Sequence, residues 1–388
     1  MGLFESIFKK REEVKKASSY FKMLTAYTPT FHTWNGEIYE AILVRASIDA
    51  IARHCAKLKA EIIGKAKEGL KSRLQNKPNP WMEWSQFLYR TATILYVNNT
   101  CFIVPVYDGG ENVVGYYPVI PSNCSVVTYG DEKEPWLRYH FSNGDVGALP
   151  MSECAILTRF QYKKDFFGEN NDALDETMDL LSIQSQGIKE AVKNSNSFRF
   201  MAQLANFAKP EDLANERKRF SAENLQGEDG GGLLLFPNTY KDIKQIDSKA
   251  YKVDADEQKL IKENVFDYFG VNEKILQNNA SAEEWSAFYE GCIEWFAVQT
   301  SQALTSAIYT TKEKQNGNML MLTANRLAYM SNSDKLKVAE TMADRGIMTR
   351  NEIREIFQLP PIDGGDYATI RGEYYTIDEN GNLTRKGE

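Results

Sequence analysis

The chain has 388 residues, of which 43% are hydrophobic and 26% are charged. This length and composition predict a globular protein of two or three packed units. No apolar run approaches the roughly 18 residues that a membrane-spanning helix needs, which argues against a membrane protein. A secretory signal is not expected either, because the basic residues Lys9, Lys10 and Arg11 follow the short apolar stretch instead of preceding it.

Charge is distributed unevenly along the chain. Residues 1–77 contain 15 Lys and Arg against 8 Asp and Glu, a net charge of +7, and the remaining residues contain 31 against 45, a net charge of −14. A protein that grips DNA through many phosphates is expected to be basic overall. Any contact of this chain with DNA is therefore expected to be weak or confined to a few residues.

The cysteines do not form a recognisable framework. There are five of them, Cys55, Cys101, Cys124, Cys154 and Cys292, and no two have the C-x-x-C spacing. Neither a zinc site nor a set of disulfides is indicated. We expect reduced, mostly buried thiols in a cytosolic protein.

The first half of the chain predicts helices followed by strands. Apolar residues recur every three or four positions over residues 38–62, which predicts a helix. A Pro78-Asn79-Pro80 turn leads into a second predicted helix at residues 81–89. Strands are predicted at residues 94–107, 113–119, 125–129, 137–141, 146–149 and 155–160. Residues 90–160 thus predict a small antiparallel β unit.

The helical period then returns. A long helix is predicted at residues 171–205 and a polar one at 211–224, followed by a glycine-rich turn at 227–232 and strands at 233–236 and 243–246. Another helix is predicted from Asp254 to Phe269, with Gly270 as its stop. After a polar loop at 271–280, Ser281 and Glu284 predict a capping box that opens a third long helix.

The C-terminal region predicts two short helices and a hairpin. The helices are expected at residues 334–345 and 351–357, with Thr349 and Glu352 capping the second and Pro360-Pro361 ending it. The hairpin is expected at residues 374–383, around Asn380-Gly381. No internal repeat is present in the sequence.

The order of these segments resembles the portal proteins of tailed bacteriophages, of the siphovirus type. The resemblance is carried by the opening MGLFESIFKK, the Pro-Asn-Pro turn with its aromatic helix, Asn98-Asn99, the stretch from Thr349 to Arg354, Leu359-Pro-Pro361 and Gly364-Gly-Asp366. It extends over nearly all of the chain, and none of its motifs is catalytic. It implies an α+β portal fold and a DNA-gating ring subunit that is not an enzyme.

The same resemblance implies a division of the chain. Residues 1–170 correspond to the N-terminal part of an α/β wing that includes the small antiparallel β unit. The remaining parts are a stem helix at 171–205, a small α/β clip at 206–250, a second stem helix at 251–270, a tunnel loop with a long helix returning to the wing at 271–333, and a short helical crown at 334–388.

Partners and contact residues are likewise implied by the resemblance. It implies a homo-oligomeric ring, twelve subunits in the virion, with double-stranded DNA passing along its axis, at the portal vertex of the capsid and in the host cytoplasm during assembly. The expected protein partners are the terminase large subunit, the major capsid or scaffold protein and a head–tail adaptor, and no cofactor is expected. The tunnel-loop residues expected to meet DNA are Lys274, Gln277, Asn278 and Asn279. The clip residues expected to meet terminase are Glu228, Asp229, Gly230, Leu234 and Phe236.

Two other classes of protein stay open at this point. One is a head–tail connector or adaptor of a non-portal type, and the other is a metal-dependent nucleic-acid-processing enzyme. The glycine-rich stretch 227–232 continues into Leu233-Leu234-Leu235 without the Lys and Ser or Thr of a phosphate-binding loop, which argues against a packaging ATPase. The acidic residues Asp172, Asp175 and Asp179 stand near the start of a predicted helix, where acids are favoured without any metal.

Overall fold

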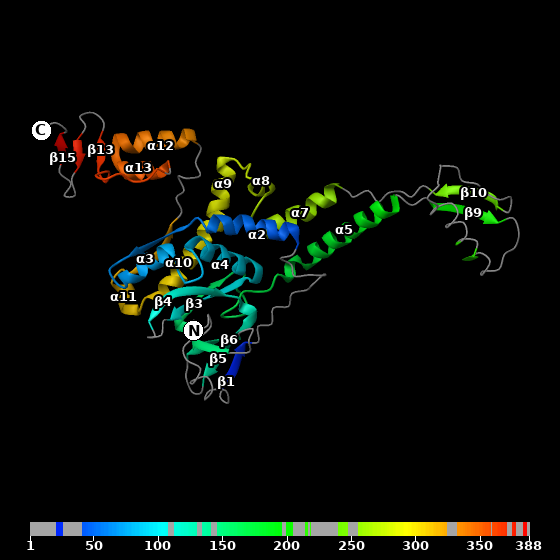
Figure 1. The fold of residues 1–388 in the computed structure, drawn as a ribbon, viewed down its shortest axis with the longest axis horizontal. Helices are drawn as coiled ribbons and strands as arrows, with labels where there is room; N and C mark the ends of the chain where they lie inside the picture. Colours follow the sequence, from blue (N-terminus) through cyan, green and yellow to red (C-terminus); the bar gives the residue numbers. More distant parts are fainter. Residues whose placement is uncertain are drawn as a thin grey trace. The chain divides into compact units, whose positions relative to one another are not determined.

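The computed structural model divides the chain into two compact units, one made of Met1–Asp175 and Glu263–Glu388 and the other of Glu176–Lys262 (Figure 1). The structure describes residues 21–25, 41–107, 112–129, 134–140, 146–195, 199–204, 214–215, 218, 240–246, 255–323, 332–357, 359–370, 375–377 and 383–385.

Two antiparallel sheets share one core in the first unit. The first sheet has the order β4-β3-β8 and the second has the order β1-β5-β6-β7. Their strands are β3 (Thr100–Tyr107), β4 (Val113–Val119), β8 (Ala155–Thr158), β1 (Phe21–Thr25), β5 (Cys124–Tyr129), β6 (Pro135–His140) and β7 (Val146–Pro150), with short 3-10 turns η2 (Pro121–Asn123) and η3 (Met151–Glu153). Phe102 of β3, Val126 of β5 and Leu137 of β6 pack in the same cluster. The antiparallel β unit predicted from the sequence is thus two sheets.

The predicted helix at residues 38–62 is shorter than expected. Helix α2 (Ile42–Cys55) ends at Cys55, and Ile62 belongs to strand β2 (Lys59–Ile63). In β2 the burial alternates residue by residue, so Ala60 and Ile62 reach the core through the period of a strand. Strand β2 pairs with β11 (Met319–Thr323), a strand that the sequence analysis did not predict.

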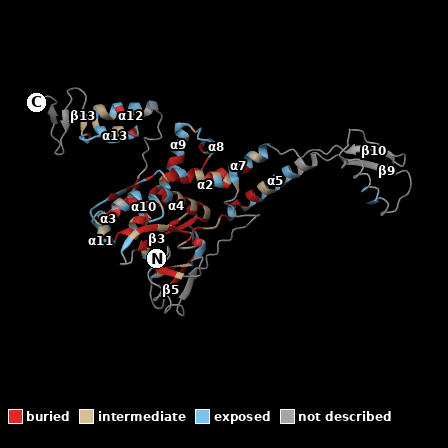
Figure 2. Cartoon of the chain, viewed as in Figure 1, coloured by how far each residue is buried: buried red, intermediate tan, exposed pale blue. Residues whose placement is uncertain are grey.

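The boundary between helix α4 and strand β3 also differs from the prediction. Helix α4 (Trp84–Asn98) continues through residues 94–98, which were predicted as strand, and begins three residues later than expected. Glu83 and Gln86 form a capping box at its start, and Asn99 ends it with a φ of 51°. Buried residues gather along α2, α4 and β3, which appear red in Figure 2.

The Pro78-Asn79-Pro80 turn lies against strand β4. The carbonyl of Pro78 accepts a hydrogen bond from the Tyr116 amide at 2.8 Å, and the Asn79 side chain donates to the Tyr116 carbonyl at 2.9 Å. A Cβ atom at Gly115 would lie 2.0 Å from the Pro78 carbonyl oxygen, so only glycine permits this approach. The turn is followed by α4, whereas α3 (Glu68–Asn76) precedes it.

The second unit contains parts of two helices and a two-stranded sheet. After the turn η4 (Asp172–Leu174), helix α5 (Asp175–Ser195) ends at Ser195, and residues 199–204 form strand β9 (Arg199–Leu204) instead of continuing the predicted helix. Strand β9 pairs antiparallel with β10 (Tyr240–Ile246). The polar helix predicted at 211–224 falls largely outside the described residues, and the strand at 233–236 falls wholly outside them.

Helix α7 (Ala255–Phe269) ends at Gly270 as predicted, and that glycine has a φ of 70°. The third long helix is interrupted by a π-helical segment. It consists of α9 (Ala282–Phe288), η6 (Tyr289–Ile293) and α10 (Glu294–Ile308), followed by the short α11 (Thr311–Gln315). The capping box of Ser281 and Glu284 is confirmed.

The C-terminal region contains the two predicted short helices and the predicted hairpin, together with strands β12 (Arg345–Thr349) and β13 (Ala368–Ile370), which were not predicted. Helices α12 (Asn332–Asp344) and α13 (Arg350–Ile356) flank strand β12, and the capping box of Thr349 and Glu352 is present. Strands β13, β14 (Tyr375–Ile377) and β15 (Leu383–Arg385) complete a four-stranded sheet with β12. The pairing of β14 with β15 confirms the predicted hairpin.

The five cysteines are buried free thiols, as the sequence analysis predicted. Among the described residues, no helix is long and apolar enough to cross a membrane.

Candidate functional site

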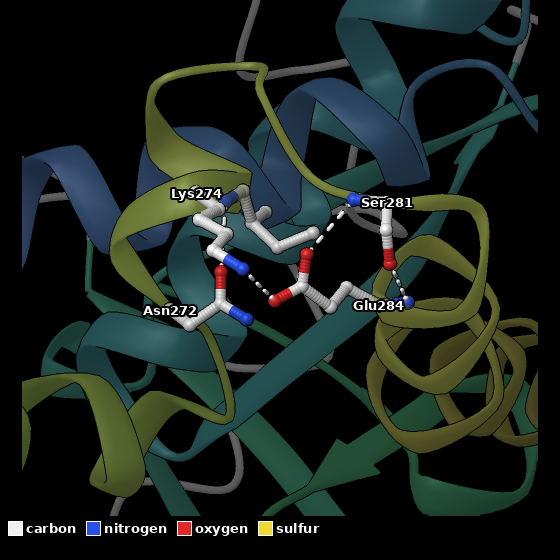
Figure 3. Close-up of polar contacts among 5 residues, drawn as sticks. Asn272, Lys274, Ser281 and Glu284 are labelled. Atoms are coloured by element: carbon white, nitrogen blue, oxygen red, sulfur yellow. Dashed lines mark hydrogen bonds and ion pairs between the residues drawn. The ribbon is translucent and has the colours of Figure 1, made fainter.

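The loop predicted to line a channel is partly helical. Residues 271–280 were expected to be an irregular polar loop, but α8 (Glu273–Leu276) forms one helical turn within it. The turn is favoured because the Asn272 side chain caps it, accepting a hydrogen bond from the Ile275 amide at 2.8 Å. The segment is therefore held in a defined conformation (Figure 3).

The charge of Lys274 is balanced within the protein. Its Nζ lies 2.7 Å from Oε1 of Glu284, and the other carboxylate oxygen of Glu284 accepts from the Ser281 amide at 2.8 Å (Figure 3). The hydrogen bond from Lys274, together with that from Ser281, lowers the pKa of Glu284. Lys274 consequently contributes little net positive charge to this loop.

Gln277, Asn278 and Asn279, the other three residues predicted to meet DNA, form different contacts. Gln277 donates from its side chain to Oε1 of Glu273 at 3.2 Å, and the Asn279 amide donates to the Lys274 carbonyl at 2.8 Å. Asn278 has a φ of 56° and lines a cavity together with residues of α2 and α4. The structure thus brings Lys274, Gln277, Asn278 and Asn279 together on one short segment, and their contact with DNA stays a prediction.

The clip residues predicted from the sequence fall outside the part of the chain that the structure describes. These are Glu228, Asp229, Gly230, Leu234 and Phe236. Their contact with terminase stays a prediction.

An arginine that sequence reasoning missed is buried among aromatic rings near the end of α7. The Arg159 guanidinium lies 4.1 Å from the centroid of Tyr96 and 4.7 Å from that of Phe160. It donates to the backbone carbonyl of Tyr268 at 3.4 Å. Burial lowers the pKa of Arg159. No carboxylate forms an ion pair with it in the described residues, so ring faces and carbonyls replace the usual acidic partner.

A hydrogen-bond network joins the same end of α7 to the segment before α5. The Tyr268 hydroxyl bonds to the side-chain oxygen of Asn171 at 2.6 Å, and the side-chain NH₂ group of Asn99 donates to that oxygen at 2.6 Å. Asn171 in turn donates to the Val97 carbonyl at 2.7 Å. Asn99 belongs to the Asn98-Asn99 pair that the sequence analysis singled out. No local sequence pattern predicted a role for Asn171 or Tyr268 in this network.

The described residues do not provide a metal site. No group of three or more His, Cys, Asp or Glu side chains is placed to hold a metal ion among them. The glycine-rich stretch 227–232 is not described.

Comparisons with known proteins identify the fold. The chain matches a neck protein of a native GTA particle computed with twelvefold symmetry, with a TM-score of 0.54, 15% identity, and coverage of 82% of this chain and 91% of that one. It also matches a protein of the virion of a native gene transfer agent particle, with a TM-score of 0.55, 15% identity, and coverage of 85% and 96%.

A weaker match is an HK97-family phage portal protein from Corynebacterium diphtheriae, with a TM-score of 0.49, 11% identity, and coverage of 74% and 93%. None of the curated proteins compared matches the sequence. The family model described as phage portal protein matches residues 43–357, which is most of the chain. The chain therefore belongs to the phage portal protein family.

Proposed function

We propose that twelve copies of this chain form a closed ring in the virion and that double-stranded DNA passes along its axis during packaging and ejection. The family match over residues 43–357 carries this proposal, because it makes the chain a portal protein of the capsid vertex. The role of this family is structural, and we propose no catalytic step.

Exposed apolar side chains on the helices of the second unit support self-association. Leu180, Ile183 and Ile188 of α5 are 48%, 65% and 37% exposed, and Leu260 of α7 is 58% exposed. Apolar residues grouped on helices favour burial against another surface. A closed ring supplies that surface, because one face of each subunit meets a different face of the next.

The division into wing, stem, clip and crown follows from the same proposal. Helices α5 and α7 are the stem. The clip includes strand β9 as well as residues 206–250, because α5 ends at Ser195. The chain from α12 to the C-terminus forms a short crown. The mixed composition of the clip, with β9 and β10 paired in it, suits a compact tip between two helices. Residues 271–280 are the tunnel loop.

DNA passes without sequence-specific recognition in this proposal. The net charge of −14 beyond residue 77 supports a lining that holds phosphates weakly, which lowers the barrier to sliding. We propose that the clip binds the terminase large subunit during packaging and a head–tail adaptor afterwards, and that the outer parts of the ring contact the capsid or scaffold protein.

Imaging and mass measurement of the purified protein test the ring. We expect annular particles in negative-stain micrographs and a native mass that is an integral multiple of the 44.2 kDa subunit, about twelvefold in the assembled head. A lone compact particle under conditions that support head assembly would contradict the proposal. Divalent-metal-dependent cleavage of DNA by the purified protein would favour an enzyme instead.

A further inference from the structure

Residues 160–165, the β8 loop, follow strand β8 and hold two exposed aromatic side chains in a fixed conformation. Phe160 has a φ of 50° and is 49% exposed, and Tyr162 is 83% exposed. A positive φ is costly for a bulky residue, and such strain is concentrated where a segment has a function. The Phe160 carbonyl accepts from the Glu169 amide at 3.0 Å, and the Glu169 carboxylate accepts from the Lys163 amide at 3.0 Å. The loop is therefore pre-organised, so that binding a partner costs little further ordering.

The exposed part of the β8 loop is aromatic and basic. Nζ of Lys163 lies 5.9 Å from the centroid of the Tyr162 ring, so the cation and the ring form one surface. Residues 160–165 contain two lysines against one aspartate. Within the described part of the chain, Lys163 forms no ion pair. An exposed tyrosine beside an unbalanced cation favours a partner surface that is apolar and acidic.

Helix α5 carries a surface of that kind, which we call the α5 face. Four residues at spacings of three and four lie along one side of the helix: Glu176, Asp179, Leu180 and Ile183. All four are exposed, the two apolar ones by 48% and 65%. Residues 171–188 contain four acidic residues and no Lys or Arg. Neither Glu176 nor Asp179 forms an ion pair with another described residue. The α5 face is thus complementary to the β8 loop in charge.

The two surfaces are close to each other along the chain. The hydrogen bond between Phe160 and Glu169 closes the loop, and Glu169 precedes Glu176 by seven residues, which span at most about 25 Å. Subunits of a closed ring are related by rotation about one axis and lie at the same height along it. Two different surfaces that meet between neighbouring copies must therefore lie at similar heights, a condition that neighbouring segments of one chain readily meet.

We propose that the β8 loop of one copy docks on the α5 face of the next copy in the ring. Tyr162 packs there against Leu180 and Ile183. Lys163 pairs with Asp179. The contact is heterologous, as a closed ring requires, because the loop and the helix face are different surfaces. This inference rests on the proposed function and names the surfaces that meet in the ring.

Charge reversal tests the pairing. The variants are Lys163→Glu, Asp179→Lys and the two combined, and Lys65→Glu is the matched control at an exposed lysine outside both surfaces. Ring formation is measured over a range of subunit concentrations by sedimentation and native mass spectrometry. We expect each single variant to need about tenfold more protein for half of its mass to be in rings, because an attraction becomes a repulsion. The control and the combined variant are expected to match the wild-type protein, since the exchanged charges of the latter remain opposite.

The variant Tyr162→Ser tests the same contact without changing a charge. We expect it to weaken ring formation by about tenfold as well, because an aromatic anchor is lost from the interface. The circular dichroism of the dilute subunit is expected to stay unchanged, since this side chain is exposed. A short DNA duplex is titrated into the same samples and followed by fluorescence anisotropy.

Three results would overturn the proposal and leave the ring in place. Equal ring formation by the wild-type protein and all variants would remove the β8 loop from the interface. Weaker rings in both single charge variants without recovery in the combined variant would show that Lys163 and Asp179 do not face each other. Intact rings with weaker duplex binding in Tyr162→Ser and Lys163→Glu would assign the loop to DNA. A wild-type protein that forms no ring contradicts the proposed function itself, and this inference with it.

Discussion

At the scale of single residues, His54 gives the protein a predictable dependence on pH. Its ring centroid lies 4.8 Å from that of Trp285 and 5.6 Å from that of Phe288. Burial, together with the nearby charges of Lys57 and Arg53, lowers the pKa of His54 to about 4. The unfolded chain, with an ordinary histidine pKa of about 6.5, therefore binds more protons than the folded chain between these values.

Stability is thus expected to fall as the pH is lowered from about 6.5 to 4, by about 2 kcal/mol from this residue. The variant His54→Phe keeps an aromatic ring beside Trp285 and removes the titration. We expect its free energy of unfolding to change less than that of the wild-type protein across this range, measured by urea unfolding at matched pH values. An identical pH dependence in the two proteins would show that His54 is not the group responsible.

At the scale of elements, helix α10 covers the outer edge of strand β11. The Thr305 hydroxyl donates to the Leu320 carbonyl at 3.1 Å and accepts from the Leu320 amide at 3.0 Å. The Ser301 hydroxyl accepts from the Leu322 amide at 2.8 Å. These bonds satisfy backbone groups that an edge strand otherwise presents to another chain.

Replacing Thr305 with Val keeps the shape of the side chain and removes both bonds to Leu320. We expect a loss of about 1–3 kcal/mol in the free energy of unfolding, because two backbone groups lose their partner. The matched control is Thr93→Val, whose hydroxyl donates at 2.8 Å to a carbonyl within its own helix. The control is expected to cost less, and equal losses in urea unfolding would contradict the role given to the edge.

The same elements show how far the sequence determines the fold. The bounds of β4 and the capping boxes at Ser281 and Thr349 depend on neighbouring residues, and they were predicted. Strands β2 and β11 were missed because they stabilise each other across about 250 residues of chain, and because Ile62 continues the helical spacing of α2. Residues 271–280 were predicted as an irregular polar loop, and the turn α8 within them was missed because the cap at Asn272 was overlooked.

At the scale of the whole molecule, the exposed apolar residues of α5 make assembly sensitive to charge. Ile183 is 65% exposed, so Ile183→Glu is expected to leave the subunit folded and to shift it from rings towards smaller species. Ser185→Glu adds the same charge to an exposed position on another face of the helix and serves as the control. Sedimentation and native mass spectrometry distinguish the two, and intact rings in the Ile183 variant would exclude this residue from the subunit interface.

At this scale, the contacts between residues far apart in the chain could not be predicted from the sequence. Arg53 and Asn278 line one cavity although 225 positions separate them, and no local pattern predicts such proximity. The order of the segments nevertheless sufficed to recognise the portal family, because that order reflects a topology and not individual contacts.

The aromatic surroundings of Arg159 affect how its contacts respond to the acid and salt that a capsid meets outside its host. Acid weakens a bond between arginine and a carboxylate by protonating the acid, and salt weakens one at the surface by screening it. The rings of Tyr96 and Phe160 accept no proton at low pH, and the guanidinium is shielded from dissolved ions by burial. We therefore expect the contact between Arg159 and the last turn of α7 to change little with pH or with salt concentration.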